Sequence, residues 1–279
     1  MIDPTTGKTL RQWQAHPPHL DNLHYFNNGA VRFSPDNRSL LTFGTPTNSA
    51  RVWDAITSEL RHELKHKDIC HDVQFSPDGR LVATAERDNR VYVWELATGE
   101  QLASLPHPDW TYTALFSPDG QHLLTACRDG MARLWDWRAG RLVCPAFEHE
   151  HEVHAVAFTP DGRHVLSATD DGALRIWEWR TGKPVCPPLA LGGAELSLAV
   201  TPDGRRVVCG GFLKALPVFH LDDWLAPAAL EPDDLCLWGE IVSGQRVEDG
   251  GGVTNLTAEE WLERWRAFHG RHPDYGKIK

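Results

Sequence analysis

Hydrophobic and polar residues alternate with a period of two in short segments along roughly the first 220 residues of the chain. Clear examples are Val73-Gln74-Phe75 and Val91-Tyr92-Val93-Trp94. Such alternation puts the hydrophobic side chains on one face of an extended segment, so it predicts short β-strands. We therefore expect residues 1–222 to form an all-β domain.

A turn signature recurs among these segments. Its proline presets φ at the second position, and the last residue suits the left-handed conformation of a hairpin turn, where Asn is the best substitute for Gly. The five copies are Ser34-Pro35-Asp36-Asn37, Ser76-Pro77-Asp78-Gly79, Ser117-Pro118-Asp119-Gly120, Thr159-Pro160-Asp161-Gly162 and Thr201-Pro202-Asp203-Gly204. Their first residues are separated by 42, 41, 42 and 42 positions, which indicates an internal repeat.

A second marker has the same period. Steps of 41, 41, 42 and 42 residues separate Trp53, Trp94, Trp135, Trp177 and Phe219. The two markers together define five units, at about residues 15–57, 58–98, 99–140, 141–182 and 183–222. Each unit is expected to supply about four strands, and because such a unit cannot bury both of its faces alone, neighbouring units must stack.

The units resemble the repeats of the WD-repeat β-propellers. In that family an early His is followed by Phe-Ser-Pro-Asp-Gly and then by an Asp shortly before a closing Trp-Asp. Units two to four follow this order. Trp-Asp or Trp-Glu occurs at Trp53-Asp54, Trp94-Glu95, Trp135-Asp136 and Trp177-Glu178. The resemblance covers about residues 1–221 and implies a propeller of five blades that acts as a scaffold for another protein or peptide.

The first residues bear on how the propeller closes. The segment Ile2-Asp3-Pro4-Thr5-Thr6-Gly7-Lys8 parallels the end of unit two. Residues 8–14 could complete blade five and latch the ring, as is usual in the family. Alternatively, the chain is the C-terminal portion of a longer propeller, an interpretation that the start within a unit favours.

The resemblance also implies a hydrogen-bonded network of His, Ser or Thr, Asp and Trp in each blade. A buried Asp needs such partners because burying it without hydrogen bonds is costly. By position the network residues are His66, Thr84, Asp88 and Trp94; His107, Thr125, Asp129 and Trp135; and His149, Ser167, Asp171 and Trp177. Unit one lacks the Asp, and unit five has apolar residues such as Cys209 and Phe219 instead.

One edge of the propeller is a candidate partner-binding surface, which we call the loop rim. The resemblance implies that this rim is built from the loop after each early His and the loop that carries each Asp. Trp and Arg are the residue types most enriched at interaction hot spots. The loop rim comprises Asp68, Arg87, Asp109, Trp110, Arg128, Glu150, Glu152 and Asp170. The alternative is that Trp110 folds back over its own blade.

Composition and charge argue against several classes of protein. The 279 residues carry a formal charge of −10, which argues against a non-specific nucleic-acid binder or a protein of anionic membrane surfaces. No apolar window is long enough to span a bilayer, and no secretory signal occurs in the first 30 residues. The six cysteines form no CxxC pair, which favours reduced thiols and a cytoplasmic location.

The segment His149-Glu150-His151-Glu152-Val153-His154 is the only dense cluster of potential metal ligands. On a strand its members alternate between two faces, so they do not converge on one ion. No nucleophile elbow or phosphate-binding loop is found either. We therefore expect no catalytic residue, metal or cofactor; a metal-dependent hydrolase using this cluster is a distant alternative.

The periodicity ends after residue 222, and residues 223–279 are predicted to form a helical C-terminal extension. Thr257-Ala258-Glu259-Glu260 is a capping box, followed by apolar residues at helical spacing, among them Trp261 and Trp265. This extension resembles the C-termini of large bacterial WD-repeat proteins, several of which carry an upstream protein kinase domain. A regulatory arm of a longer serine/threonine kinase is therefore a second candidate function.

Overall fold

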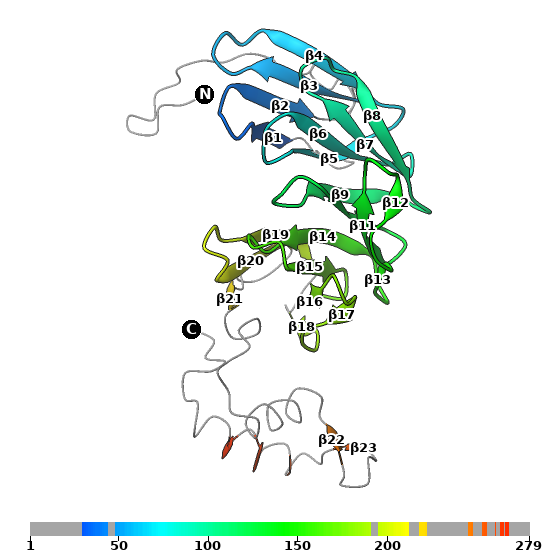
Figure 1. Ribbon diagram of the computed structural model, residues 1–279, viewed down its shortest axis with the longest axis vertical. Helices are drawn as coiled ribbons and strands as arrows, with labels where there is room; N and C mark the ends of the chain where they lie inside the picture. Colours follow the sequence, from blue (N-terminus) through cyan, green and yellow to red (C-terminus); the bar gives the residue numbers. More distant parts are fainter. Residues whose placement is uncertain are drawn as a thin grey trace, which may run out of the picture.

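A computed structural model describes residues 30–43, 48–190, 195–211, 218–221, 245–247 and 253–255, with a few positions between 260 and 267. Its main feature is a row of five antiparallel sheets, which we call blades one to five. The prediction of an all-β propeller of five blades is confirmed. In Figure 1 the blades follow one another along an open arc, from β1–β4 to β19–β21.

Each blade is built from consecutive strands that pair in chain order, except that β13 pairs with β11 and β18 pairs with β16. Blade one contains β1 (Ala30–Phe33), β2 (Ser39–Phe43), β3 (Ser49–Asp54) and β4 (Leu60–Lys65). Blade two contains β5 (Cys70–Phe75), β6 (Leu81–Glu86), β7 (Arg90–Glu95) and β8 (Gln101–Pro106). Blade three contains β9 (Thr111–Phe116), β10 (Leu123–Cys127), β11 (Met131–Asp136), β12 (Arg141–Leu142) and β13 (Phe147–Glu148).

In blade four, as in blade three, two short strands take the place of a single outer strand, and blade five has three described strands. Blade four contains β14 (Val153–Phe158), β15 (His164–Thr169), β16 (Ala173–Glu178), β17 (Lys183–Pro184) and β18 (Leu189–Ala190). Blade five contains β19 (Glu195–Val200), β20 (Arg206–Gly211) and β21 (Val218–His220). The first strands of neighbouring blades contact one another, so they form the inner side of the arc.

The hydrophobic core lies between consecutive blades. Alternate residues of β2 and β3 face blade two, where they meet residues from its first three strands. This interface contains Leu41, Phe43, Ala50, Val52, Val73, Val82 and Trp94, all less than a tenth exposed. Equivalent clusters join blades two and three, three and four, and four and five. Stacking therefore buries the faces that a single blade would expose.

The recurring turns fix the end of each inner strand. In all five copies the Ser or Thr hydroxyl donates to the Asp carboxylate at 2.5–2.6 Å. Gly79 has φ of +70°, and Asn37 has φ of +58°, as the sequence predicts for these positions. A Cβ at Gly79 would lie 3.4 Å from the ring of Pro35 in the preceding blade, so consecutive turns pack against each other.

The C-terminal extension contains a hairpin that the sequence did not predict. Two short strands, β22 (Gln245–Val247) and β23 (Val253–Asn255), form an antiparallel hairpin within it. Their Val and Thr residues favour strands, and glycines lie between them in the sequence, which suits a reversal. In the segment that follows the predicted capping box, the described residues 260, 263, 264, 266 and 267 are helical, and the rest of the predicted helices lie outside the described residues. No helix in the described part of the chain is long and apolar enough to cross a membrane.

Candidate functional site

Blade three carries a hydrogen-bonded triad behind its closing tryptophan. His107 Nε2 lies 2.9 Å from Thr125 Oγ1, and the indole N–H of Trp135 donates to the same oxygen at 3.1 Å. Blade four repeats the arrangement with His149, Ser167 and Trp177, at 2.7 Å and 2.9 Å. The triad ties the loop histidine to the second and third strands of each blade.

Burial sets the protonation of these histidines. Desolvation lowers the pKa of His107 to about 4, and the nearby charge of Arg133 acts in the same direction. Desolvation also lowers the pKa of His149 to about 4, helped by Arg175. Both imidazoles are therefore neutral at pH 7, where they are suited to bonding a hydroxyl rather than a carboxylate.

The expected Asp is not hydrogen-bonded to the His in any of these three blades. Asp129 bonds Arg133, with Oδ2 and Nη2 2.6 Å apart, and Asp88 accepts from the Tyr92 hydroxyl at 2.6 Å. Asp171 contacts Thr169 and lies 3.6 Å from Arg175. In each blade a residue four positions later competes for the carboxylate, and a charged guanidinium is a stronger partner than a neutral imidazole. The predicted network of four residues is therefore a triad in blades three and four.

Blade two replaces part of the triad with a buried acid. Trp94 donates to Thr84 Oγ1 at 3.1 Å, but His66 Nδ1 contacts Glu86 Oε1, and both of these side chains are fully buried. Burial raises the pKa of Glu86, against the lowering effect of His66. Sequence reasoning missed Glu86. The signal for it was its departure from the repeat, because Cys127 and Thr169 occupy the equivalent positions.

Trp110 on the loop rim stands between two blades. The guanidinium carbon of Arg87, from blade two, lies 3.9 Å from the centroid of its ring, and that of Arg128, from blade three, lies 4.7 Å away. Trp110 is half-buried. The structure therefore brings together three of the predicted partner-binding residues, and Trp110 bridges blades instead of covering only its own.

Glu152 completes this part of the loop rim. Its Oε1 lies 3.0 Å from Arg128 Nε, and its Oε2 accepts from the Tyr112 hydroxyl at 2.7 Å. The hydrogen bonds of Tyr112 and Arg128 lower the pKa of Glu152 against desolvation. The carboxylate is thus ionised and fixes both the guanidinium and the tyrosine ring.

A row of stacked rings lies beside these residues on the inner strands. The ring of Tyr112 stacks on His71 at 5.5 Å and on His154 at 4.5 Å between centroids. The three residues come from β5, β9 and β14 at steps of 41 and 42. Sequence analysis did not assign the stack, although this spacing was its available signal.

The comparisons with known proteins agree with this repeat architecture. Residues 58–95, 99–136 and 143–178 match the family model described as WD domain, G-beta repeat. The chain contains three WD40 repeats. Each matched WD40 segment ends on the third strand of a blade, whereas β1–β3 and β19–β21 lie outside the matches. A search of curated proteins found no match.

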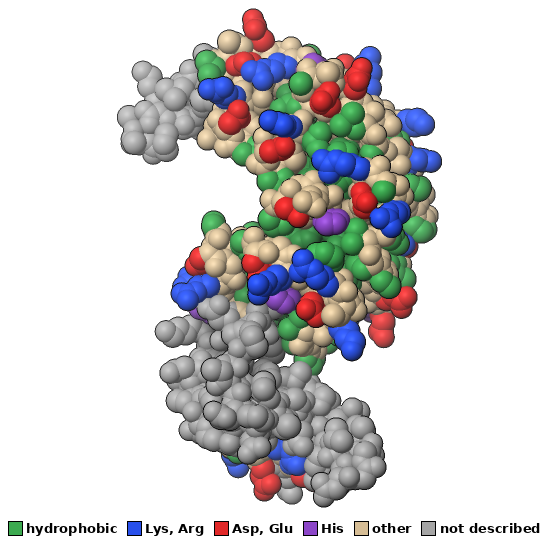
Figure 2. Space-filling model, viewed as in Figure 1, with side chains coloured by type: hydrophobic (Ala, Val, Ile, Leu, Met, Phe, Trp, Pro, Cys, Tyr) green, Lys and Arg blue, Asp and Glu red, His purple; other side chains and the backbone are tan. Residues whose placement is uncertain are grey.

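The remaining predicted residues of the WD40 loop rim are held locally. Asp68 and Asp109 accept the backbone N–H of the next residue, at 2.7 Å and 2.8 Å. Asp170 Oδ1 lies 3.2 Å from His154 Nε2. In Figure 2, basic and acidic side chains are interspersed over the described blades, with hydrophobic side chains between them. The described surface in this view therefore has no broad field of one sign.

The cluster at residues 149–154 is divided by the WD40 fold. His149 is committed to the triad of blade four, Glu152 bonds Arg128 and Tyr112, and His154 belongs to the ring stack. No three His, Cys, Asp or Glu side chains among the described residues are arranged to hold a metal ion.

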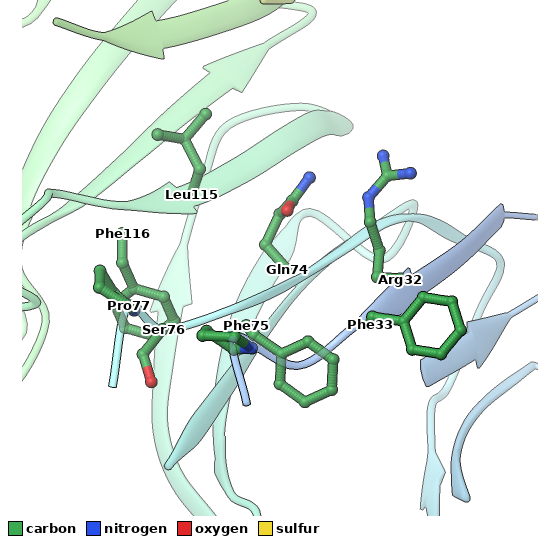
Figure 3. Close-up of a pocket in the computed structure, with 9 residues that line it drawn as sticks. Arg32, Phe33, Gln74, Phe75, Ser76, Pro77, Leu115 and Phe116 are labelled. Atoms are coloured by element: carbon green, nitrogen blue, oxygen red, sulfur yellow. The ribbon is translucent and has the colours of Figure 1, made fainter. Parts of the chain in front are cut away.

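A shallow groove lies at the opposite end of the inner strands, where the turns of blades one and two meet the end of β9. Its volume is about 280 Å³. Phe33, which is 50% exposed, and Phe75 form part of its wall, and Arg32 and Gln74 also line it (Figure 3). The described blades therefore present two distinct ends, the charged loop rim and this largely apolar groove.

Proposed function

We propose that the chain is a non-enzymatic scaffold that binds another protein or a peptide through the loop rim. WD40 repeats generally mediate interactions between proteins, which supports this class of function. The observation that carries the choice of surface is the half-buried Trp110 held between two guanidiniums. A rigid aromatic ring flanked by arginines has the composition of an interaction hot spot.

The remaining polar residues support a scaffold over an enzyme. The histidines and hydroxyls of blades three and four bond each other inside the triads, and Asp129 and Asp171 pair with arginines. The described cysteines are free thiols, most of them buried, which is compatible with the proposed cytoplasmic location.

The proposal is tested by selecting peptides that bind the full chain from a displayed random library and measuring their affinity by fluorescence anisotropy. Trp110→Ala should weaken binding by roughly thirtyfold, since a hot-spot residue contributes about 2 kcal/mol. Phe33→Ser, an exposed substitution in the groove at the other end, is the control and should leave the affinity unchanged. Near-UV circular dichroism verifies that both variants are folded.

Selected peptides that bind Trp110→Ala as tightly as the wild-type chain would show that the loop rim is not the binding surface. Loss of binding in the control alone would move the site to the groove.

A further inference from the structure

Arg87 and Arg128 hold equivalent places in successive repeats, 41 residues apart, and lie against the same indole. Arg128 does two things at once: its guanidinium contacts Trp110, and its Nε bonds Glu152 at 3.0 Å. The chain therefore contains its own example of a carboxylate bound to a guanidinium beside Trp110.

Arg87 contacts Trp110 but, unlike Arg128, is not bonded to a carboxylate of the described residues. No carboxylate of the described residues forms an ion pair with it. The cause is positional. Each arginine reaches toward the next blade, where Arg128 meets Glu152 and Arg87 meets Trp110, at the equivalent position 42 residues earlier. The neighbouring acids Asp68 and Asp109 accept backbone N–H groups of their own loops.

We infer that Arg87 is the receptor for a carboxylate of the partner, and that the partner segment is an acidic peptide. This inference rests on the proposed function of the loop rim. A guanidinium presents its donors in a planar fork that matches a carboxylate. The contact with Trp110 and its half-buried position already restrict Arg87, so little further side-chain freedom is lost on binding.

The overall charge makes the inference specific. A chain with a formal charge of −10 has no general attraction for acidic peptides, and neither sign dominates the described surface in Figure 2. A preference for Asp or Glu among selected peptides would therefore have to come from a local cation.

The experiment uses the peptides selected against the full chain. We expect enrichment of Asp or Glu at one position, and a loss of at least tenfold in affinity when that residue is changed to Gln or Asn. Arg87→Gln should cause a similar loss, and the two changes together should cost little more than either alone, as in a double-mutant cycle of a direct pair. Arg87→Lys should recover only part of the affinity, because the planar fork is lost.

The matched control is Arg138→Gln. Arg138 also lies over a tryptophan, with its guanidinium carbon 4.1 Å from the ring centroid of Trp137, but it is outside the loop rim. This variant should bind like the wild-type chain.

The outcomes separate the two proposals. Peptides that depend on Trp110 but show no acidic preference, or an acidic preference that Arg87→Gln does not change, would overturn the role of Arg87 and leave the loop rim as the binding surface. The absence of any peptide that depends on Trp110 would overturn both. A phosphoserine at the acidic position that binds more than tenfold tighter than Glu would replace the carboxylate with a phosphate as the preferred group.

Discussion

Acid should destabilise the propeller through the buried histidine of blade three. His107 is 7% exposed, and its pKa falls from 6.5 to about 4 on folding. Because the folded-state pKa is lower, the unfolded chain binds the proton first as the pH drops. The stability from neutral His107 is present above pH 6.5 and is lost as the pH falls toward 4. Between pH 7 and pH 5 the loss is about 2 kcal/mol for this one group.

The measurement is urea unfolding followed by tryptophan fluorescence at pH 7 and pH 5. His107→Gln keeps a polar side chain but cannot titrate, so its unfolding free energy should fall by about 2 kcal/mol less than that of the wild-type chain over this range. Asp72, whose pKa burial raises to about 6, acts in the opposite direction, but it is present in both proteins and cancels. The exposed His151 provides the control variant His151→Gln, which should behave like the wild-type chain.

An equal loss of stability in His107→Gln and the wild-type chain would refute the reasoning. It would mean that His107 takes up its proton as readily in the folded protein as in the unfolded chain, so that the triad does not depend on a neutral imidazole.

Two further predictions concern packing. His66→Leu leaves Glu86 buried without its partner and should lower the unfolding free energy by about 3 kcal/mol or more. Adding Glu86→Cys should recover most of that loss. Urea unfolding at pH 7 measures both variants, and equal unfolding free energies for the single and the double variant would contradict the pairing. Gly130→Ala should lower thermal stability by more than Gly140→Ala, because both have positive φ but only a Cβ at Gly130 would lie 2.8 Å from the backbone oxygen of His149. Equal melting temperatures would show that the close approach of the His149 backbone to Gly130 is unimportant.

Most of the repeat architecture was predictable because it depends on features that recur. The turn residues and the closing tryptophans each have a single local role, so their period of 41 or 42 residues fixed the number of blades and the place of the loop rim. Trp110, Arg87 and Arg128 were grouped correctly, since residues of equivalent loops lie at the same end of every blade.

It was less predictable which side chains hydrogen-bond to each other within a blade. Repeat spacing places Asp129 near His107, but it does not show that Arg133 takes the carboxylate once the imidazole is neutral. Glu86 occurs once, so the period gives no information about it. The stack around Tyr112 depends on how closely inner strands of different blades approach, which is a property of the assembled arc and not of one unit.

The WD40 segments and the blades are out of step by one strand. The matched segment 58–95 begins with β4, yet β4 pairs with β3 of the preceding blade, and the segment 99–136 likewise begins with β8 of blade two. Each of the three matched segments thus begins with a strand that pairs in the preceding blade. If one whole unit were duplicated or lost from the middle of the gene, each remaining blade there would still receive an outer strand from the unit that follows it. The offset also places each of these boundaries inside a blade, so a chain cut at such a boundary loses the outer strand of the blade before the cut as well as the blade after it.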